Sequence, residues 1–248
     1  MGTSWHVSCV SDATIAPQLD AVISKALDEV DQAMSTYKPN SEVSLFSKSS
    51  NGISVSAPSF YVISVALDIA KQTNGAFDPT VMPLVNMWGF GPETNSPSAP
   101  TDAAIASAMK ICGWQHLQLS NDSFFVGKDI AELEIDLSAI AKGFGADNVA
   151  AALDASGVAD YMIEVGGEVR VRGNSGKQRP WRLAIDSPNA KNYARIIELT
   201  SGAIATSGDY RNMRVVDGEL VSHTIDPTTG RPITHNLASV SIVAQNCT

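Results

Sequence analysis

The 248-residue sequence has few cysteines, a shortage of basic residues and no long apolar run. Its cysteines, Cys9, Cys112 and Cys247, are odd in number, which excludes a complete disulfide framework, and they lie far apart in the sequence, which excludes the paired spacing of a zinc site. No apolar stretch reaches the roughly 20 residues of a membrane-spanning helix. Seventeen Lys and Arg stand against 26 Asp and Glu, a formal net charge of −9. Because nucleic acid is also negative, general nucleic-acid binding is disfavoured.

Common catalytic and nucleotide-binding fingerprints are missing as well. The glycine pair at 143–145 lacks the third glycine of a dinucleotide-binding turn, and Gly176-Lys177 is followed by Gln178, which excludes a P-loop. No Gly-x-Ser-x-Gly elbow marks a serine hydrolase. Any function must therefore reside in less general motifs.

The composition is that of a folded globular protein, with 44% hydrophobic and 17% charged residues. Helical spacing of apolar residues predicts helices at 17–34, 60–72, 101–113 and 139–155. Strand-like runs occur at 4–10, 116–126, 132–137, 161–172, 181–186, 195–206, 213–225 and 238–244, and Asp217-Gly218 predicts a hairpin turn. Helices dominate the first part and antiparallel strands the second, so we expect an α+β fold in a single domain spanning 1–248.

Two early segments suit either a ligand site or plain structure. Tyr37 lies among small hydroxyl residues after the first predicted helix, as a ligand-binding loop or as an ordinary helix end. Asp78 lies on a predicted strand (75–80) that leads to the aromatic, glycine-rich turn at Trp88. Aromatic rings beside glycines allow a flat ligand to stack close to the backbone, and a strand with a β-turn is the plainer interpretation.

Two later segments combine charge with tight turns. Asp136 and Lys142 flank the start of the fourth predicted helix, where backbone amides and a cation attract phosphate, although Ser138 also suits a simple helix cap. In Glu164-Val-Gly166-Gly-Glu168, paired glycines inside a strand indicate either a bulge or close contact with a ligand.

A final segment carries a histidine and an aspartate near a hairpin. His223 and Asp226 suit proton transfer or a metal shell, and equally a hydrogen bond that fixes a loop.

Together, and in this order, the segments resemble the ApbE family of FAD:protein FMN transferases. The resemblance runs from residue 1 to about 244 and is carried by Met1-Gly-Thr, Met34-Ser-Thr-Tyr37, Gly75-Ala-Phe-Asp78, Trp88-Gly-Phe-Gly91, Asp136 with Ala141-Lys-Gly143, Glu164-Val-Gly-Gly167, Thr206-Ser-Gly-Asp209 and His223-Thr-Ile-Asp226-Pro. It implies a T-fold-type architecture with FAD in a cleft between two halves. It further implies transfer of FMN from FAD to a threonine or serine hydroxyl of an acceptor flavoprotein, with release of AMP and dependence on Mg²⁺.

The resemblance also implies roles for particular residues. The FAD contacts it implies are Met1, Tyr37, Ala76, Phe77, Asp78, Asp136, Lys142 and Ile225, and the residue patterns add Trp88, Glu164 and Gly166. The Ala139 carbonyl is the expected Mg²⁺ ligand, with a further Asp- and Thr-bearing metal-binding segment expected beyond residue 248. Because a threonine hydroxyl must lose a proton to attack phosphorus, His223 is the first candidate base and Asp226 the second.

The family further implies a partner and a location. The expected acceptor is a subunit of a membrane redox complex, and the expected location is periplasmic, as an inner-membrane-associated lipoprotein whose targeting and lipid-anchoring segment lies outside these 248 residues. The alternatives that stay open are an FAD pyrophosphatase, which uses water in place of threonine, and a non-catalytic FAD-binding protein. A purely structural α+β protein is the third.

Overall fold

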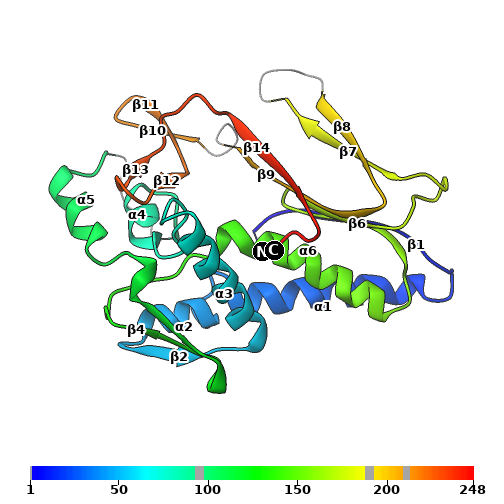
Figure 1. The fold of residues 1–248 in the computed structure, drawn as a ribbon, viewed down its shortest axis with the longest axis horizontal. Coiled ribbons are helices and arrows are strands. Elements are labelled where there is room, and N and C mark those ends of the chain that lie inside the picture. Colours follow the sequence, from blue (N-terminus) through cyan, green and yellow to red (C-terminus); the bar gives the residue numbers. More distant parts are fainter. Residues whose placement is uncertain (1, 93–97, 188–192, 209–212) are drawn as a thin grey trace. The chain divides into compact units, whose positions relative to one another are not determined.

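A computed structural model of the chain describes residues 2–92, 98–187, 193–208 and 213–248 (Figure 1). The chain divides into two compact units. Unit 1 comprises Met1–Asp31, Ala139–Gly208 and Leu237–Thr248, and unit 2 comprises Gln32–Ser138 and Asp209–Asn236. The predicted single domain and the predicted cleft between halves stay predictions.

Helices and antiparallel strands make up both units, which confirms the α+β class. The helices are α1 (Ala16–Met34), α2 (Glu42–Lys48), α3 (Ala57–Gln72), α4 (Met82–Met87), α5 (Asp102–Met109) and α6 (Ser138–Ala155), with short 3₁₀ turns at Trp114–His116 and Asn121–Ser123. The strands are β1 (Trp5–Val10), β2 (Gly52–Ser54), β3 (Leu117–Ser120), β4 (Phe125–Lys128), β5 (Asp160–Val165), β6 (Glu168–Arg172), β7 (Trp181–Asp186), β8 (Tyr193–Leu199), β9 (Ser201–Gly208), β10 (Met213–Val216), β11 (Glu219–Ser222), β12 (Ile225–Asp226), β13 (Arg231–Pro232) and β14 (Ser239–Ala244). Within the described ranges, none of the helices combines the length and the apolarity needed to cross a bilayer.

Unit 1 is built on an antiparallel sheet of five strands in the order β1-β5-β6-β9-β14. Helices α1 and α6 lie against one face, and the β7–β8 hairpin packs on the other (Figure 1). The helix side buries apolar residues of α1, α6 and β5, and burial of each large side chain contributes about 1.5–3 kcal/mol. The core on this side includes Leu19, Ile23, Leu27, Val149, Leu153, Tyr161, Ile163 and Val165.

Strands β5 and β6 are joined by a two-residue turn, which corrects the prediction of one continuous strand over 161–172. Val165 pairs with Glu168, so Gly166 and Gly167 form the turn itself. Their φ values of 59° and 100° are the left-handed values that a tight hairpin requires. The paired glycines are therefore turn residues and not a bulge inside a strand.

Unit 2 combines short helices with small sheets. Strands β2, β4 and β3 form a three-stranded sheet, and β10–β11 and β12–β13 form two-stranded ones. A hydrophobic cluster joins α4, α5 and the hairpin strands, and its buried members are Leu84, Trp88, Ile105, Ala108, Val216 and Ile225. Asp217 and Gly218 have φ values of 50° and 86°, which confirms the predicted hairpin turn.

Two predicted strands are wrong. The segment that carries Asp78 is a loop between α3 and α4. The run 132–137 is not a strand either, because the backbone amide of Asp136 donates to the carbonyl of Pro79 at 2.7 Å, outside any sheet. At 132–137 the alternation of acidic and apolar residues suggested a strand, but the local hydrogen-bond partner is a loop. Helices α2 and α4, of seven and six residues, went unpredicted because they are too short to show a helical period.

Candidate active site

The loop between α3 and α4 is held by a buried carboxylate. Asp78 is 8% exposed, and its Oδ1 accepts hydrogen bonds from the backbone amide and the hydroxyl of Thr80, at 2.8 and 2.7 Å. Its Oδ2 accepts a 3.1 Å bond from the amide of Trp114. Asp78 therefore fixes the loop, whatever further contact it makes with a ligand.

Thr80 completes this network from a fully buried position. Its hydroxyl accepts a 2.6 Å hydrogen bond from the amide of Gly113, in addition to the bond that it donates to Asp78. Gly75 ends the helix with a φ of 80°, and a Cβ there would lie 3.3 Å from the indole nitrogen of Trp114. Between these anchors, Ala76 is exposed and Phe77 is half-buried, so both are available to a ligand.

Tyr37 is an open member of the predicted FAD contacts, with 70% of its surface exposed. The hydroxyl residues around it have structural roles. Ser41 caps α2 by accepting from the amide of Ser44, and its own hydroxyl donates to the Ser35 carbonyl at 2.6 Å. The serines therefore hold the loop, while the tyrosine ring is free to stack on a flat ligand.

Asp136 caps the first residue of α6. Its Oδ1 accepts a 2.8 Å hydrogen bond from the amide of Ser138, where the helix begins. The capping role that the sequence assigned to Ser138 is thus carried by Asp136. Ala139, the predicted Mg²⁺ ligand, is exposed in the first turn of the helix.

Trp88 and Ile225 are core residues. Both belong to the hydrophobic cluster of unit 2, and the indole nitrogen of Trp88 donates to the carbonyl of Gly230 at 2.9 Å. Gly230 itself must be a glycine, because its φ is 66° and a Cβ would lie 2.6 Å from Ile105. Their predicted contact with FAD stays a prediction.

His223 and Asp226 lie on either side of Ile225, in a segment fixed at several points. The hydroxyl of Ser222 accepts a 3.1 Å hydrogen bond from the amide of Thr224, which fixes the backbone on both sides of His223. The His223 ring packs edge-on against Phe90, with the ring centroids 6.3 Å apart. Asp226 accepts from the amide and hydroxyl of Thr228 at 2.8 and 2.7 Å.

The two candidate bases differ in their chemistry. The hydrogen bond from the Thr228 hydroxyl lowers the pKa of Asp226, which partial burial only partly opposes. A carboxylate of lowered pKa is a weak acceptor of a proton from a hydroxyl. Asp226 is better suited to organising the turn at 226–230, which leaves His223 as the stronger candidate base.

Lys142 is held in unit 1 by a residue that the predicted site did not include. Its Nζ donates to Oε1 of Glu168 at 2.5 Å, and Glu168 is 7% exposed. Gly166 leaves room for the lysine stem, because a Cβ there would lie 2.7 Å from Cδ of Lys142 and 2.8 Å from the Thr3 hydroxyl. Burial raises the pKa of Glu168, and Lys142 counteracts that effect.

A second charged pair joins α6 and β6 beyond Lys142 and Glu168. Nε of Arg170 lies 3.7 Å from Oδ1 of Asp147. Asp147 also accepts from the amides of Cys247 and Thr248 and from the Thr248 hydroxyl, the last at 2.6 Å. Burial, with the Asp147 carboxylate adding to it, raises the pKa of the Cys247 thiol to about 12. Sequence patterns gave no sign of Asp147 or Arg170, because their roles depend on pairing across the helix and the sheet.

Glu164 is on the neighbouring strand β5 and faces away from these two charged pairs. Its Oε1 accepts a 2.6 Å bond from the amide of Gly167, and its Oε2 lies 3.0 Å from Nδ1 of His6. It therefore stabilises the Gly166-Gly167 turn, and any contact that it makes with FAD stays a prediction.

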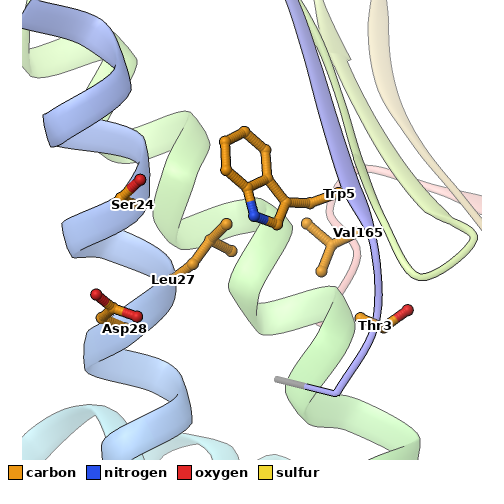
Figure 2. A pocket seen from close by; sticks show the side chains of 6 residues that line it. All are labelled: Thr3, Trp5, Ser24, Leu27, Asp28 and Val165. Carbon is orange, nitrogen blue, oxygen red and sulfur yellow. The ribbon is translucent and has the colours of Figure 1, made fainter.

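Unit 1 also contains a small pocket of about 230 Å³ between β1 and α1 (Figure 2). Trp5 and Leu27 approach each other across it, and Ser24 and Asp28 occupy successive turns of α1. Thr3 and Val165 complete the lining. Thr3 also adjoins Gly166, so one residue of the pocket lining lies beside the turn that supports Lys142.

The predicted site residues thus form local groups within each unit. Unit 2 brings Asp78 together with Thr80 and Trp114, and Unit 1 brings Lys142 together with Gly166 and Glu168. Met1 lies outside the described residues. Among the residues that the structure describes, no group of three His, Cys, Asp or Glu side chains is arranged to hold a metal ion.

Comparisons with known proteins agree with these motifs. A model of the ApbE family matches residues 1–248. A Vibrio cholerae protein described as "FAD:protein FMN transferase" is 43% identical over 253 residues, covering all of this chain and 75% of that protein. The solved structure of the flavin transferase ApbE from Vibrio cholerae matches with a TM-score of 0.91 and 42% identity, over 100% of this chain and 80% of that one. The apo flavinyl transferase ApbE from Pseudomonas stutzeri matches with a TM-score of 0.89 and 32% identity, over 100% and 78%. Family, sequence and fold agree over the whole length, and the chain belongs to the ApbE family.

Proposed function

We propose that this chain is an FAD:protein FMN transferase that attaches FMN to a threonine, or less often a serine, of an acceptor flavoprotein. The observation that carries the proposal is the match of all 248 residues to the ApbE family, together with a 43% identical relative described by that activity. The positions of the family motifs add support, because Asp78, Asp136 and Lys142 are each held by hydrogen bonds that fix their backbone or charge.

The proposed reaction forms one bond and breaks another at a single phosphorus. The acceptor threonine oxygen bonds to the phosphorus of the FMN half, the bond from that phosphorus to the AMP oxygen breaks, and AMP leaves. The hydroxyl proton moves to the imidazole of His223, a group that titrates near neutral pH. Lys142 offers a cation to the negative charge of the phosphates.

Mg²⁺, with the carbonyl of Ala139 as one ligand, is part of the proposal. It would supply charge neutralisation between the phosphates. Among the described residues, no group of three His, Cys, Asp or Glu side chains is placed to hold a metal ion, so the carbonyl of Ala139 is the one ligand that the proposal names.

The proposed acceptor is a subunit of a membrane redox complex, and the proposed location is the periplasm, as a lipoprotein associated with the inner membrane. Both proposals rest on the family resemblance. Transfer to a recombinant acceptor subunit, and fractionation of cells that express the natural protein, test them separately.

The central experiment combines transfer and product analysis. The purified chain is mixed with FAD, Mg²⁺ and an acceptor flavoprotein subunit, and flavin fluorescence on the denatured acceptor is followed in a gel, with AMP measured by chromatography. Transfer predicts fluorescent acceptor and equal AMP, and both disappear when the acceptor threonine is replaced by alanine. FMN released without any acceptor would instead indicate an FAD pyrophosphatase, and binding without turnover would indicate a non-catalytic FAD-binding protein.

His223→Ala tests the proposed base. We expect most of the transferase activity to disappear while the Kd for FAD stays within about tenfold, or about 1.4 kcal/mol. The matched control is His235→Ala, because His235 is exposed and belongs to none of the motifs that carry the family resemblance. A stable, FAD-binding His223→Ala chain that transfers FMN at the wild-type rate would contradict this role.

A further inference from the structure

Glu168 and Lys142 form a charge pair in which the carboxylate is buried and the lysine is partly exposed. Glu168 is 7% exposed, and its Oε1 lies 2.5 Å from Nζ of Lys142. In the described part of the chain, Oε2 of Glu168 has no hydrogen-bond partner. If the ammonium moved away, a whole carboxylate would be left buried without a donor, which is strongly unfavourable.

The lysine stem is also confined by its surroundings. Gly166 lies against Cδ of Lys142, close enough that a Cβ would lie 2.7 Å from it. Glu168 follows two residues later, on the other side of the hairpin turn. The same turn therefore supplies both the surface that supports the stem and the carboxylate that holds the charge.

The ammonium keeps the capacity to bind an anion. It carries three N–H donors, and the side chain of Lys142 is 33% exposed. Lys142 lies in the second turn of α6, an 18-residue helix whose N-terminal end favours negative charge. One donor is directed to Glu168, so the ammonium has further donors to offer to an anion.

We propose that Glu168 is a positioning residue that fixes the Lys142 ammonium for the pyrophosphate of FAD, an inference that rests on the proposed function. A cation already held in place loses little conformational freedom when it binds a phosphate oxygen. An effect of net charge and an effect of position predict opposite changes in FAD binding when Glu168 is neutralised. If charge alone mattered, neutralising Glu168 would strengthen the attraction to pyrophosphate, whereas loss of position weakens binding.

The test compares flavins with and without phosphate. Glu168→Gln keeps the size of the side chain and removes its charge. Calorimetry is expected to show a Kd for FAD raised about tenfold, equivalent to about 1.4 kcal/mol, and an unchanged Kd for riboflavin, which has no phosphate. The matched control is Glu198→Gln on β8, a carboxylate that is exposed and lies outside the site, and it should change neither.

A double-mutant cycle separates positioning from a general structural effect. Lys142→Met should weaken FAD binding, and adding Glu168→Gln to it should change the Kd less than twofold, because the residue acts only through the lysine. Thermal melts accompany each variant. If Glu168→Gln does not fold, Glu168→Asp replaces it, because aspartate keeps the charge but its side chain is one methylene shorter. The same weakening of FAD binding, with an unchanged Kd for riboflavin, is then expected.

Several results would overturn the inference: FAD binding that is unchanged or tighter in Glu168→Gln, an equal loss for riboflavin, or independent effects in the cycle. A wild-type chain that binds FAD but modifies no acceptor contradicts the proposed function only, and the Kd values still decide the role of Glu168. A wild-type chain that binds no FAD contradicts both.

Discussion

The network around Thr80 allows a stability prediction worked from individual hydrogen bonds. In Thr80→Val the side chain keeps its shape and loses its hydroxyl, at a site that is 0% exposed. Two bonds disappear: the 2.7 Å bond donated to Asp78 and the 2.6 Å bond accepted from the amide of Gly113. A hydrogen bond to a charged group contributes about 1.5–3 kcal/mol and a neutral one about 0.5–1.5 kcal/mol. We therefore expect the free energy of unfolding to fall by about 2–4 kcal/mol.

The control for this variant is Thr80→Ser, which keeps the hydroxyl and removes one buried methyl group. Its expected cost is only about 0.8 kcal/mol. Urea unfolding followed by tryptophan fluorescence gives both free energies, and thermal melts should show Thr80→Val lower by roughly 5–15 °C, since each kcal/mol corresponds to about 2–4 °C at this size. Because Asp78 and the loop at 76–78 depend on Thr80, FAD binding should weaken in the valine variant and not in the serine variant.

The reasoning would be refuted by a Thr80→Val chain within about 0.5 kcal/mol of the wild type, or by a serine variant that is the less stable of the two. Either result would mean that the loop satisfies the amide of Gly113 and the carboxylate of Asp78 in another way.

Other regions of the chain give further predictions. Gly230→Ala should be strongly destabilising, because φ is 66° and the new Cβ would lie 2.6 Å from a core methyl group. Gly218→Ala, at φ 86° in open space, should lower the free energy of unfolding by only about 1–2 kcal/mol, and thermal melts compare the two variants directly. Burial lowers the pKa of Lys128, so the unfolded state binds a proton more readily than the folded state between that lowered pKa and 10.5. The stability of the wild type relative to Lys128→Met should therefore rise with pH in that window. Urea titrations from pH 7 to 10.5 that show a flat or falling difference in the free energy of unfolding would contradict this prediction. Partial burial and nearby carboxylates raise the pKa values of the Cys112 and Cys247 thiols to about 12. Both thiols should therefore react slowly with a disulfide reagent at pH 8 in the native chain and rapidly after unfolding in guanidinium, and fast native labelling of either would contradict its raised pKa.

The sequence by itself determined the family and the class of fold, because both depend on local patterns. Motifs such as Gly75-Ala-Phe-Asp78 and His223-Thr-Ile-Asp226 are short and ordered along the chain, so they can be identified without coordinates. Helical periodicity located α1, α3 and α6 because each is long enough to show several turns.

Short helices and the pairing partners of individual residues could not be predicted from the sequence. A helix of six or seven residues shows too few turns for its period to be recognised. The segments around Asp78 and at 132–137 resembled strands in sequence, but both are loops in the structure. The difference between a bulge and a turn at Gly166-Gly167 depended on the pairing of Val165 with Glu168, a fact of register.

Only the tertiary structure decided how the charged residues are partnered. Glu168 is separated from Lys142 by 26 positions, and Asp147 is separated from the amide of Cys247 by 100. The sequence of a strand does not show whether one of its carboxylates faces water or is buried against a lysine. The folded chain decides, because burial makes an unpaired charge costly and therefore fixes which residues must pair.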